Sequence, residues 1–339
     1  MLNSNLNKLL ITAGFTLAVC FFIPTGSFAQ VNWVNVDTGF APLPPGMHVF
    51  KTNDSLDDKP FIAYYVKVFL KEKTIDFTTD TTLRRRLTPL QFYEKNDKPV
   101  LVVNGTFFSF ESNQNLNMVI KDGRLVSHTV KRTRSKADTT LFNDTLFLRG
   151  AIGISKKRVA DIAWVSSDSS KRYAYAKQSL EKEFLPVVVT DGNPEFVKME
   201  NEKSNRRFTA DTSLKKWKMR TAISGGPVLL DESGVKIFNE EEKMFTGKAI
   251  KDKHPRTCMG YTNNGYLIIM VIQGRFPGIA EGATLEQEAK LLRGLGCIEA
   301  LNLDGGGSSC MLINGKETIK PSEKGVERPV PAVFIVKQN

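Results

Sequence analysis

Residues 301–311 read Leu-Asn-Leu-Asp-Gly-Gly-Gly-Ser-Ser-Cys-Met, and the rest of the chain is best interpreted outward from this stretch. A short apolar strand ends in one carboxylate, Asp304, and three glycines follow it directly. Each glycine in such a run loses maximal backbone entropy when it becomes ordered. The run is therefore expected where a ligand must approach main-chain N–H groups, and Asp304 is predicted to lie in a site. The alternative is a flexible turn before a hairpin, although a plain turn needs only one or two glycines.

A helix is predicted immediately before this strand. Thr284 and Gln287 have the spacing of a capping box, which satisfies the free N–H groups of a helix start. Gly294 and Gly296 lie where a helix end favours glycine. The apolar residues between them follow helical spacing: Leu285, Ala289, Leu292 and Leu295. We expect this apolar stripe to face the core.

Most other apolar segments have the composition of strands. The clearest are residues 62–70, 99–103, 222–230, 257–261 and 266–272. The turns Asn263-Asn264-Gly265 and Asn314-Gly315 each predict a β-hairpin. The expected fold class is α+β, a mixed and mainly β domain with a few helices packed on the sheets.

The N-terminal residues 1–29 have the pattern of a secretory signal peptide. Lys8 precedes an apolar run over residues 9–23, and Ser27-Phe28-Ala29 supplies small residues for cleavage. A retained N-terminal anchor is the alternative, but the run is short for a membrane span. The chain is therefore expected to be exported, either periplasmic or secreted, with no stable membrane span after cleavage.

Two further segments precede and interrupt the expected domain. Residues 30–60 are rich in Pro, Gly, Asn and Asp, and we expect a lead-in segment with little core of its own. Residues 61–339 are expected to form one domain. Within it, residues 131–145 and 166–183 are charged and polar and are interpreted as excursions from the core.

Composition limits the partners. After signal cleavage three cysteines remain, Cys258, Cys297 and Cys310, and an odd number argues against a disulfide framework. Cys258 and Cys310 either face one another or are simply small buried residues. The net charge of +11 favours an anionic small substrate or polymer, while export makes nucleic acid an improbable partner. A solvated lysine-rich surface explains the charge equally well.

Several strands end at glycines or polar residues, and this pattern predicts a shared site. Strand ends at one rim of a sheet bring distant segments together, and glycine loops leave space for a ligand. Arginine binds phosphate through a fork of donors, and consecutive glycine amides form an anion nest. The segments are Asn104-Gly105, Ser224-Gly225-Gly226, His254 to Thr257, Gln273-Gly274-Arg275, Asp304 to Ser308, and Glu327-Arg328-Pro329.

In order and spacing, these segments resemble the phosphodiester glycosidase family over roughly residues 61–336. The resemblance is carried by residues 103–108, 223–227, 254–257, 274–275, 284–285 with the helix, 302–309, 321–322 and 327–329. It implies hydrolysis of a sugar-1-phosphodiester, such as a GlcNAc-1-phosphodiester, to free sugar and phosphomonoester. The implied partner is therefore an anionic glycan or sugar-phosphate substrate. It also implies that residues 61–339 form a phosphodiester glycosidase-like domain.

The resemblance also implies which residues line the active site: Asn104, Gly225, Gly226, Arg256, Arg275, Asp304, Gly305, Gly306 and Ser308. The chain departs from the family pattern at three positions. Thr106 replaces a second glycine, Gln273 replaces an aspartate before Gly-Arg, and Cys310 stands where Thr or Ala is commoner. Gln273 matters most, because it removes a carboxylate.

The expected mechanism uses one carboxylate. A departing phosphomonoester is a weak base, so the second carboxyl group of ordinary glycoside hydrolysis is dispensable. Asp304 would act as nucleophile or as base for water, while Arg256 and Arg275 hold the phosphate. The amides of Gly225, Gly226 and residues 305–307 would donate to substrate. The remaining expected substrate contacts are Asn104, Ser224, Gln273, Gly307, Ser308 and Glu327.

Some roles remain open in the sequence. His254 is either an acid/base or a structural residue before proline, and Glu327 is either a second carboxylate or the ion-pair partner of Arg328. No cofactor is expected as the first hypothesis. Asp304 is alternatively a ligand of Ca²⁺ or another hard cation, whereas the chain lacks the His and Cys spacing of a zinc site.

Two other functions compete with the glycosidase. One is a non-catalytic protein that binds a glycan or envelope polymer on the same scaffold, which the Gln273 replacement favours. The other is a phosphodiesterase that cuts the P–O bond on the far side and releases sugar-1-phosphate.

Overall fold

Alternation along one central strand shows how the sheets pack. In β18 (Tyr266–Ile272), Leu267, Ile269 and Val271 belong to one buried cluster. The intervening residues of the same strand, Ile268 and Met270, belong to another. Successive side chains of a strand point to opposite faces, so the sheet that contains β18 is covered on both sides.

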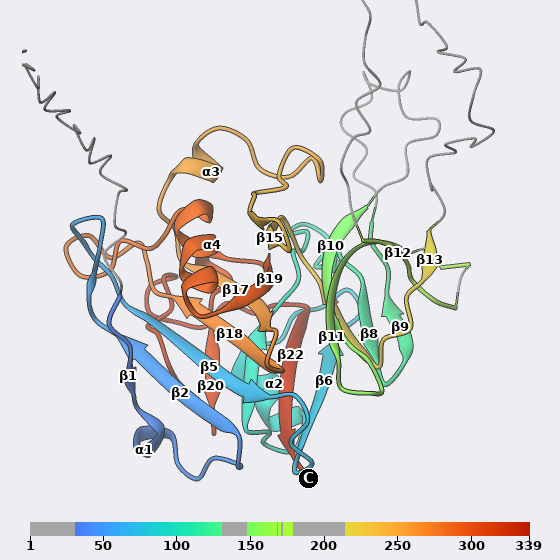
Figure 1. Ribbon diagram of the computed structural model, residues 1–339, viewed down its shortest axis with the longest axis horizontal. Coiled ribbons are helices and arrows are strands. Elements are labelled where there is room, and N and C mark those ends of the chain that lie inside the picture. The colour runs from blue at the N-terminus through green and yellow to red at the C-terminus, as the bar shows by residue number, and fades with distance from the viewer. Residues whose placement is uncertain (1–30, 131–147, 168, 171, 179–213) are drawn as a thin grey trace, which may run out of the picture. The chain divides into compact units, whose positions relative to one another are not determined.

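The structure is a computed structural model, and it describes residues 31–130, 148–167, 169–170, 172–178 and 214–339 (Figure 1). The expected signal peptide lies outside the described residues, as do the 131–145 excursion and part of the 166–183 excursion.

The largest sheet has eight strands, in the order β1-β2-β5-β18-β17-β19-β15-β16. Its other strands are β1 (Val34–Asn35), β2 (Met47–Thr52), β5 (Ala63–Phe69), β17 (Arg256–Thr262), β19 (Cys297–Asn302), β15 (Val228–Asp231) and β16 (Gly234–Val235). The segment 30–60 is not the separate lead-in that we expected. It supplies β2, which pairs with β5 along its whole length, and buries Met47 and Val49 in the core.

Two further sheets complete the architecture. The first has the order β13-β12-β11-β10-β14-β8-β9: Lys215–Lys216, Tyr175–Lys177, Ala160–Ser166, Arg149–Ile154, Thr221–Ser224, Val119–Lys121 and Arg124–Ser127. The second has the order β21-β20-β7-β22-β6: Lys316–Glu317, Met311–Ile313, Leu101–Asn104, Ala332–Gln338 and Ile75–Thr81. A short hairpin joins β3 (Ser55–Leu56) to β4 (Lys59–Pro60).

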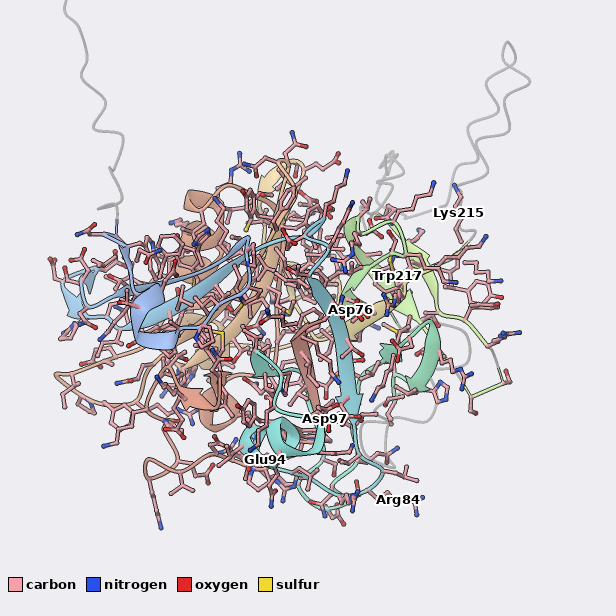
Figure 2. All side chains as sticks on the ribbon, turned by 90° about the horizontal axis from the view of Figure 1, so that it is seen from below. Asp76, Arg84, Glu94, Asp97, Lys215 and Trp217 are labelled. Atoms are coloured by element: carbon pink, nitrogen blue, oxygen red, sulfur yellow. The ribbon has the colours of Figure 1, made fainter. Side chains whose placement is uncertain are left out.

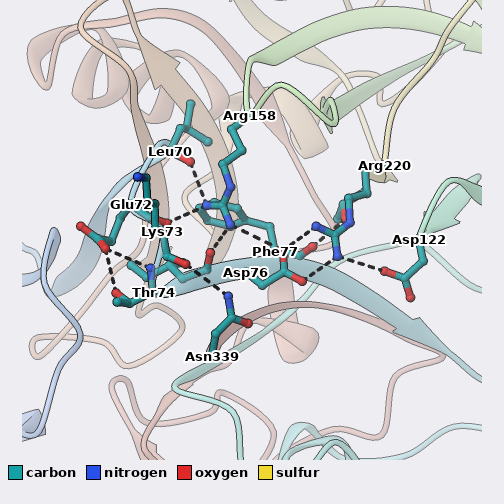
Figure 3. A network of polar contacts seen from close by, with 12 residues as sticks. Leu70, Glu72, Lys73, Thr74, Asp76, Phe77, Asp122, Arg158, Arg220 and Asn339 are labelled. Carbon is teal, nitrogen blue, oxygen red and sulfur yellow. Dashed lines mark hydrogen bonds and ion pairs between the residues drawn. The ribbon is translucent and has the colours of Figure 1, made fainter.

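One hydrophobic cluster joins all three large sheets. It contains Val66 of β5, Val103 of β7 and Ile152 of β10, each essentially inaccessible to solvent. Polar contacts also connect two of the sheets. Near the start of β6, both carboxylate oxygens of Asp76 accept hydrogen bonds from Arg220, which directly precedes β14, at 3.0 and 2.8 Å (Figure 3). Arg158 donates to the carbonyl oxygens of Leu70 and Glu72 beside it.

The helices are few and short: α1 (Asp37–Phe40), α2 (Pro89–Lys95), α3 (Lys248–Lys251), α4 (Leu285–Gly294) and the 3₁₀ turn η1 (Gly306–Ser308). The predicted capping box of Thr284 and Gln287 is present at the start of α4. The apolar stripe of α4 packs on the eight-stranded sheet (Figure 1). The expected α+β class, mainly β, is confirmed. No helix of the described part of the chain has the length and apolar character needed to cross a membrane.

Candidate functional site

Asp304 lies where two of the sheets meet. The chain leaves β19 at Asn302, and the Leu303 N–H donates to the Thr257 carbonyl of β17 at 2.8 Å. One residue later, the Asp304 N–H donates to the Gly105 carbonyl at 2.8 Å, directly after β7. The backbone of Asp304 therefore bridges the eight-stranded and the five-stranded sheets.

Asn104 fastens this bridge. Its Nδ2 donates to the Asp304 carbonyl at 2.6 Å. Its Oδ1 accepts from the Thr257 hydroxyl at 2.8 Å and from the Cys310 N–H at 3.1 Å. Asn104 is completely buried, so these contacts are shielded from water. The structure thus places Asn104 beside Asp304, as predicted, and shows its amide engaged with protein groups.

The Asp304 carboxyl group is poorly satisfied. Its Oδ2 is buried and has no hydrogen-bond partner within the described residues. Burial raises the pKa of Asp304 to about 7, and a hydrogen bond from Ser308 and the charge of Arg328 only partly oppose this rise. A carboxyl group with such a pKa is half protonated near neutral pH, which suits proton transfer or nucleophilic attack.

Each glycine after Asp304 allows a close approach. A Cβ on Gly305 would lie 2.8 Å from the Pro255 carbonyl oxygen, and the Gly306 N–H donates to that same oxygen at 2.8 Å. Gly306 has φ 63°, and a Cβ there would lie 3.0 Å from Nη2 of Arg275. A Cβ on Gly307 would overlap the guanidinium of Arg328.

The two arginines that flank the glycine loop are therefore Arg275 and Arg328. Arg275 is exposed, and the described residues provide it with no hydrogen bond or ion pair. Arg328 forms an ion pair with Glu323 and donates to the Ser308 hydroxyl at 3.4 Å. Of the two roles left open for Glu327, the ion pair with Arg328 is not formed, because Arg328 pairs with Glu323 instead.

Arg256 is close to the site but faces a different way. It is 4 % exposed, and its Nε donates to the Ala283 carbonyl at 2.9 Å. Its Nη2 donates to the Asp252 carbonyl at 3.3 Å. Within the described residues neither Arg256 nor Arg275 forms an ion pair with Asp304; the cation whose charge acts on that carboxyl is Arg328.

A second buried acid, Glu288, was not predicted from the sequence. It lies on α4, is fully buried, and neither carboxylate oxygen has a hydrogen-bond partner among the described residues. Burial raises its pKa to about 7, against the charge of Arg256 and a contact with Cys258. The sequence did carry a signal for its burial, because Glu288 lies between Leu285 and Leu292 on the apolar stripe of the helix.

His254 lies among the same cations. Burial and the charges of Arg256 and Arg275 lower the pKa of His254, which favours the neutral ring. Its Nδ1 is buried and without a partner in the described part of the chain. His254 therefore lies within reach of the charges of Arg256 and Arg275, which oppose its protonation.

The segment after β14 packs against the site without offering donors to it. The Gly225 N–H donates to the Gly150 carbonyl at 3.0 Å and the Gly226 N–H to the Asn302 carbonyl at 2.8 Å. These two amides, like that of Gly306, are therefore already bonded to carbonyl groups of the protein, and their donation to substrate stays a prediction. The Ser224 hydroxyl likewise donates to the Gly150 carbonyl at 2.8 Å.

The last two predicted residues make structural contacts. Gln273 is buried, and its Oε1 accepts from the Lys320 N–H at 2.9 Å. The Oε2 of Glu327 accepts from the Leu90 N–H at 2.9 Å, in the first turn of α2. A helix N-terminus favours a carboxylate, so Glu327 has a stabilising partner there.

No group of three or more His, Cys, Asp or Glu side chains suited to a metal ion occurs among the described residues. The three described cysteines, Cys258, Cys297 and Cys310, are free and buried. Burial raises the pKa of the Cys258 and Cys310 thiols, so neither is an activated nucleophile.

Comparison with known proteins supports the resemblance seen in the sequence. The phosphodiester glycosidase family model matches residues 186–337. The prophage-derived uncharacterized protein YomE of Bacillus subtilis is 33 % identical over 126 residues, which are 37 % of this chain and 18 % of that protein. The mouse N-acetylglucosamine-1-phosphodiester α-N-acetylglucosaminidase is 29 % identical over 102 residues, 30 % of this chain and 19 % of the enzyme. The match thus spans less than a fifth of either relative.

Solved structures share the fold at low identity. A hypothetical protein from Synechocystis aligns with a TM-score of 0.60 and 15 % identity, over 91 % of this chain and 68 % of that one. The catalytic domain of the zebrafish N-acetylglucosamine-1-phosphodiester α-N-acetylglucosaminidase aligns with a TM-score of 0.57 and 18 % identity, over 91 % and 89 %. The predicted resemblance to the phosphodiester glycosidase family is confirmed.

Proposed function

We propose, from the match of residues 186–337 to the phosphodiester glycosidase family, that this chain hydrolyses a sugar-1-phosphodiester to free sugar and phosphomonoester. The observation that carries the proposal is the Asp304 carboxyl, whose buried Oδ2 has no partner in the described residues. It stands at the start of a glycine loop that lies between two arginines, Arg275 and Arg328. A carboxylate beside cationic support is what this reaction requires.

Arg275 and Arg328 are the proposed phosphate ligands. Both guanidinium groups lie against the glycine loop, and Arg275 has no competing carboxylate in the described residues. Arg328 is held by Glu323, whose side chain is 52 % exposed, so an incoming phosphate can displace it. Guanidinium groups match phosphate geometry and stabilise the charge that grows on the leaving group. Arg256, which was expected in this role, is assigned to positioning instead.

The proposed reaction breaks the bond between the anomeric carbon and the bridging oxygen. The electron pair of that bond leaves with the phosphomonoester, which Arg275 and Arg328 stabilise. Asp304 either attacks the anomeric carbon to form an ester that water then cleaves, or takes a proton from the attacking water. In both cases water supplies the new hydroxyl oxygen of the sugar and one proton to the phosphate product.

Glu288 and Arg256 are proposed to position the residues of this site without contacting substrate. Arg256 holds the carbonyl oxygens of Ala283 and Asp252, and adjoins Pro255, whose own carbonyl accepts from Gly306. The carboxyl of Glu288 lies close enough for the Arg256 charge to act on it. We assign Glu288 the role of a positioning residue that acts through Arg256.

The test is incubation with a GlcNAc-1-phosphodiester in ¹⁸O-labelled water, with and without EDTA. Free sugar that carries the label supports the glycosidase. Label in the phosphate would support the phosphodiesterase, and binding without release would support the glycan-binding protein. Loss of turnover in EDTA, restored by Ca²⁺, would show that the reaction needs a hard cation. The substitution Asp304→Asn is expected to lower turnover by several orders of magnitude.

Export to the periplasm or the exterior remains part of the proposal. It is based on the signal-like residues 1–29, and an anionic envelope or host glycan would be the substrate met there. The measurement is the N-terminal sequence of the protein recovered from each cell fraction.

A further inference from the structure

An exposed aromatic ring lies beside the proposed active site. Phe110 is 63 % exposed, although its ring packs against Phe108 with centroids 4.7 Å apart. The Cζ of Arg86 lies 5.5 Å from the Phe110 ring centre, and the Cζ of Arg328 lies 5.2 Å from it. An exposed aromatic ring between two guanidinium groups offers a ligand an apolar face and positive charge together.

The neighbouring segment adds charge to this surface. Arg84 and Arg85 are exposed, and Figure 2 shows Arg84 projecting from its loop on the side of the molecule that bears α2. Within the described residues none of Arg84, Arg85 or Arg86 forms an ion pair with a carboxylate. Their charges are therefore not neutralised by the protein there. We call Arg84, Arg85, Arg86, Phe108 and Phe110 the Arg86–Phe110 rim.

The rim is joined to the active site through Arg328. The guanidinium that lies over Phe110 also donates to the Ser308 hydroxyl, and its charge acts on the Asp304 carboxyl. Backbone hydrogen bonds also hold the segment that carries Arg84 to Arg86 beside the segment that follows Arg328. The Thr82 N–H donates to the Pro331 carbonyl at 2.9 Å, and Leu87 pairs with Val330. A ligand that reaches from Asp304 across Arg328 would meet the rim next.

We propose that the Arg86–Phe110 rim is a second anion subsite, which binds the part of the substrate that extends past the scissile phosphate. The proposal depends on the proposed function of Asp304. It assigns the substrate to a class: an oligomer that carries further phosphates, rather than one diester with a small neutral group. The rim arginines would bind the next phosphate, and the Phe110 ring would cover the apolar face of an adjoining sugar.

The experiment compares two substrates on the intact protein. One is a methyl diester of GlcNAc-1-phosphate, and the other is an oligomer of several phosphate-linked GlcNAc units. Both are assayed with the wild type and with Phe110→Ala, Arg86→Gln and Arg293→Gln. Arg293 is the matched control, because it is exposed and lies near the start of β19, at the opposite end of that strand from Asp304.

The wild type is expected to cleave the oligomer with a kcat/KM about tenfold higher than the methyl diester. Phe110→Ala and Arg86→Gln are expected to remove about fivefold of this advantage and to change methyl diester cleavage less than about twofold. Raising the salt should weaken the oligomer preference, because phosphate–arginine attraction is screened. Equal cleavage of both substrates, or an equal loss in Arg293→Gln, would overturn the subsite.

Failure of the proposed function gives a different result. If the wild type cleaves neither substrate, the subsite is tested by binding alone. Calorimetry then measures the affinity of the uncleaved oligomer for the wild type and for each variant. Binding that weakens about fivefold or more in Phe110→Ala and Arg86→Gln, but not in Arg293→Gln, supports the subsite. No binding, or the same binding in all variants, overturns it.

Discussion

The carboxyl group of Asp304 is in a position where ionisation is unfavourable. Burial outweighs the hydrogen bond from Ser308 and the charge of Arg328, and the pKa rises to about 7. The ionised form is also the one that a nucleophile or a base requires. Two consequences follow, one for the rate and one for the stability, and they can be measured independently.

The first consequence is a pH-dependent rate. We expect kcat/KM for a sugar-1-phosphodiester to rise as the pH increases through about 7, because only then is Asp304 ionised in the free enzyme. The diester stays ionised throughout, so the profile reports the protein. Initial rates between about pH 5 and pH 9, with fluorescence to confirm folding, give the midpoint. A flat profile would remove Asp304 from the ionising role.

The second consequence concerns unfolding. A folded-state pKa above the unfolded one means that stability falls as the pH rises between about 4 and 7. Asp304→Asn removes this cost, so its unfolding free energy at about pH 8 should exceed that of the wild type by roughly 1–3 kcal/mol. Urea unfolding at about pH 4 and pH 8 tests this, and the gain should be small at the lower pH.

Asp80 is the matched control. Although it is buried, hydrogen bonds and charges from Lys95, Asn96 and Lys121 outweigh that burial and lower its pKa. Its ionised form therefore stabilises the fold above the unfolded pKa, and this stabilisation is lost as the pH falls through the lower folded pKa. Asp80→Asn should destabilise at about pH 8, opposite in sign to Asp304→Asn. Two shifts of the same sign would refute this electrostatic account.

At this scale the sequence predicted Asp304 and its glycine loop, because three adjacent glycines have few structural uses. It did not predict that Arg328 is the cation whose charge acts on the Asp304 carboxyl. The partner of a long arginine side chain depends on how its loop folds: Arg328 pairs with Glu323 and donates to Ser308, whereas the adjacent Glu327 contacts α2. Gln273 could not be interpreted either, because its partner Lys320 becomes a neighbour only after folding.

At the scale of elements, α4 carries the buried Glu288, on which the charge of Arg256 acts, and leads into β19. Its capping box is complete: the Thr284 Oγ1 accepts from the Gln287 N–H at 3.1 Å, and the Gln287 Oε1 accepts from the Thr284 N–H at 2.9 Å. These two bonds satisfy donors that a helix start otherwise leaves unpaired.

Thr284→Ala should therefore lower the unfolding free energy by about 1 kcal/mol. Thr284→Ser retains the oxygen and should recover most of the loss. Thr88→Ala is a matched comparison, since α2 begins with the same capping box at Thr88 and Gln91. Urea unfolding of the three variants measures the differences, and a loss in Thr284→Ser as large as in Thr284→Ala would show that the oxygen is not responsible.

The two helices also show what local patterns can reveal. The sequence predicted α4 because its cap, stripe and terminal glycines agree. We did not predict α2, although Thr88, Pro89 and Gln91 carry the same start signal, because only seven residues follow and no long stripe confirms it. Both predicted hairpins are confirmed, because asparagine and glycine in the turn determine their local geometry.

At the scale of the whole molecule, the order of strands could not be predicted. Neighbours such as β5 and β18, or β7 and β22, are separated by about two hundred residues, and no local signal encodes their pairing. Residues 30–60 were misjudged for a different reason: their Pro, Gly, Asn and Asp content hid the strand β2, which is buried by pairing with the nearby β5. The convergence on Asp304 follows from these pairings.

Asn104 couples the sheets at that convergence. It bonds β17 through Thr257, the residue before β20 through the Cys310 N–H, and the loop itself through the Asp304 carbonyl. Asn104→Ala leaves a buried hydroxyl, N–H and carbonyl without partners, which should lower the unfolding free energy by about 2–4 kcal/mol. It should also lower kcat, because Asp304 loses the contact that fixes its backbone.

Asn96→Ala is the control for this last prediction. Asn96 is also buried, and its Nδ2 donates to Asp80 at 2.9 Å and to the Phe92 carbonyl at 2.9 Å, at the end of α2. Its loss should destabilise the fold by a similar amount and leave the kcat of the folded enzyme unchanged. Unfolding in urea and initial rates at a temperature where both variants are folded separate the two effects. A kcat that falls equally in both would show that Asn104 acts only through stability.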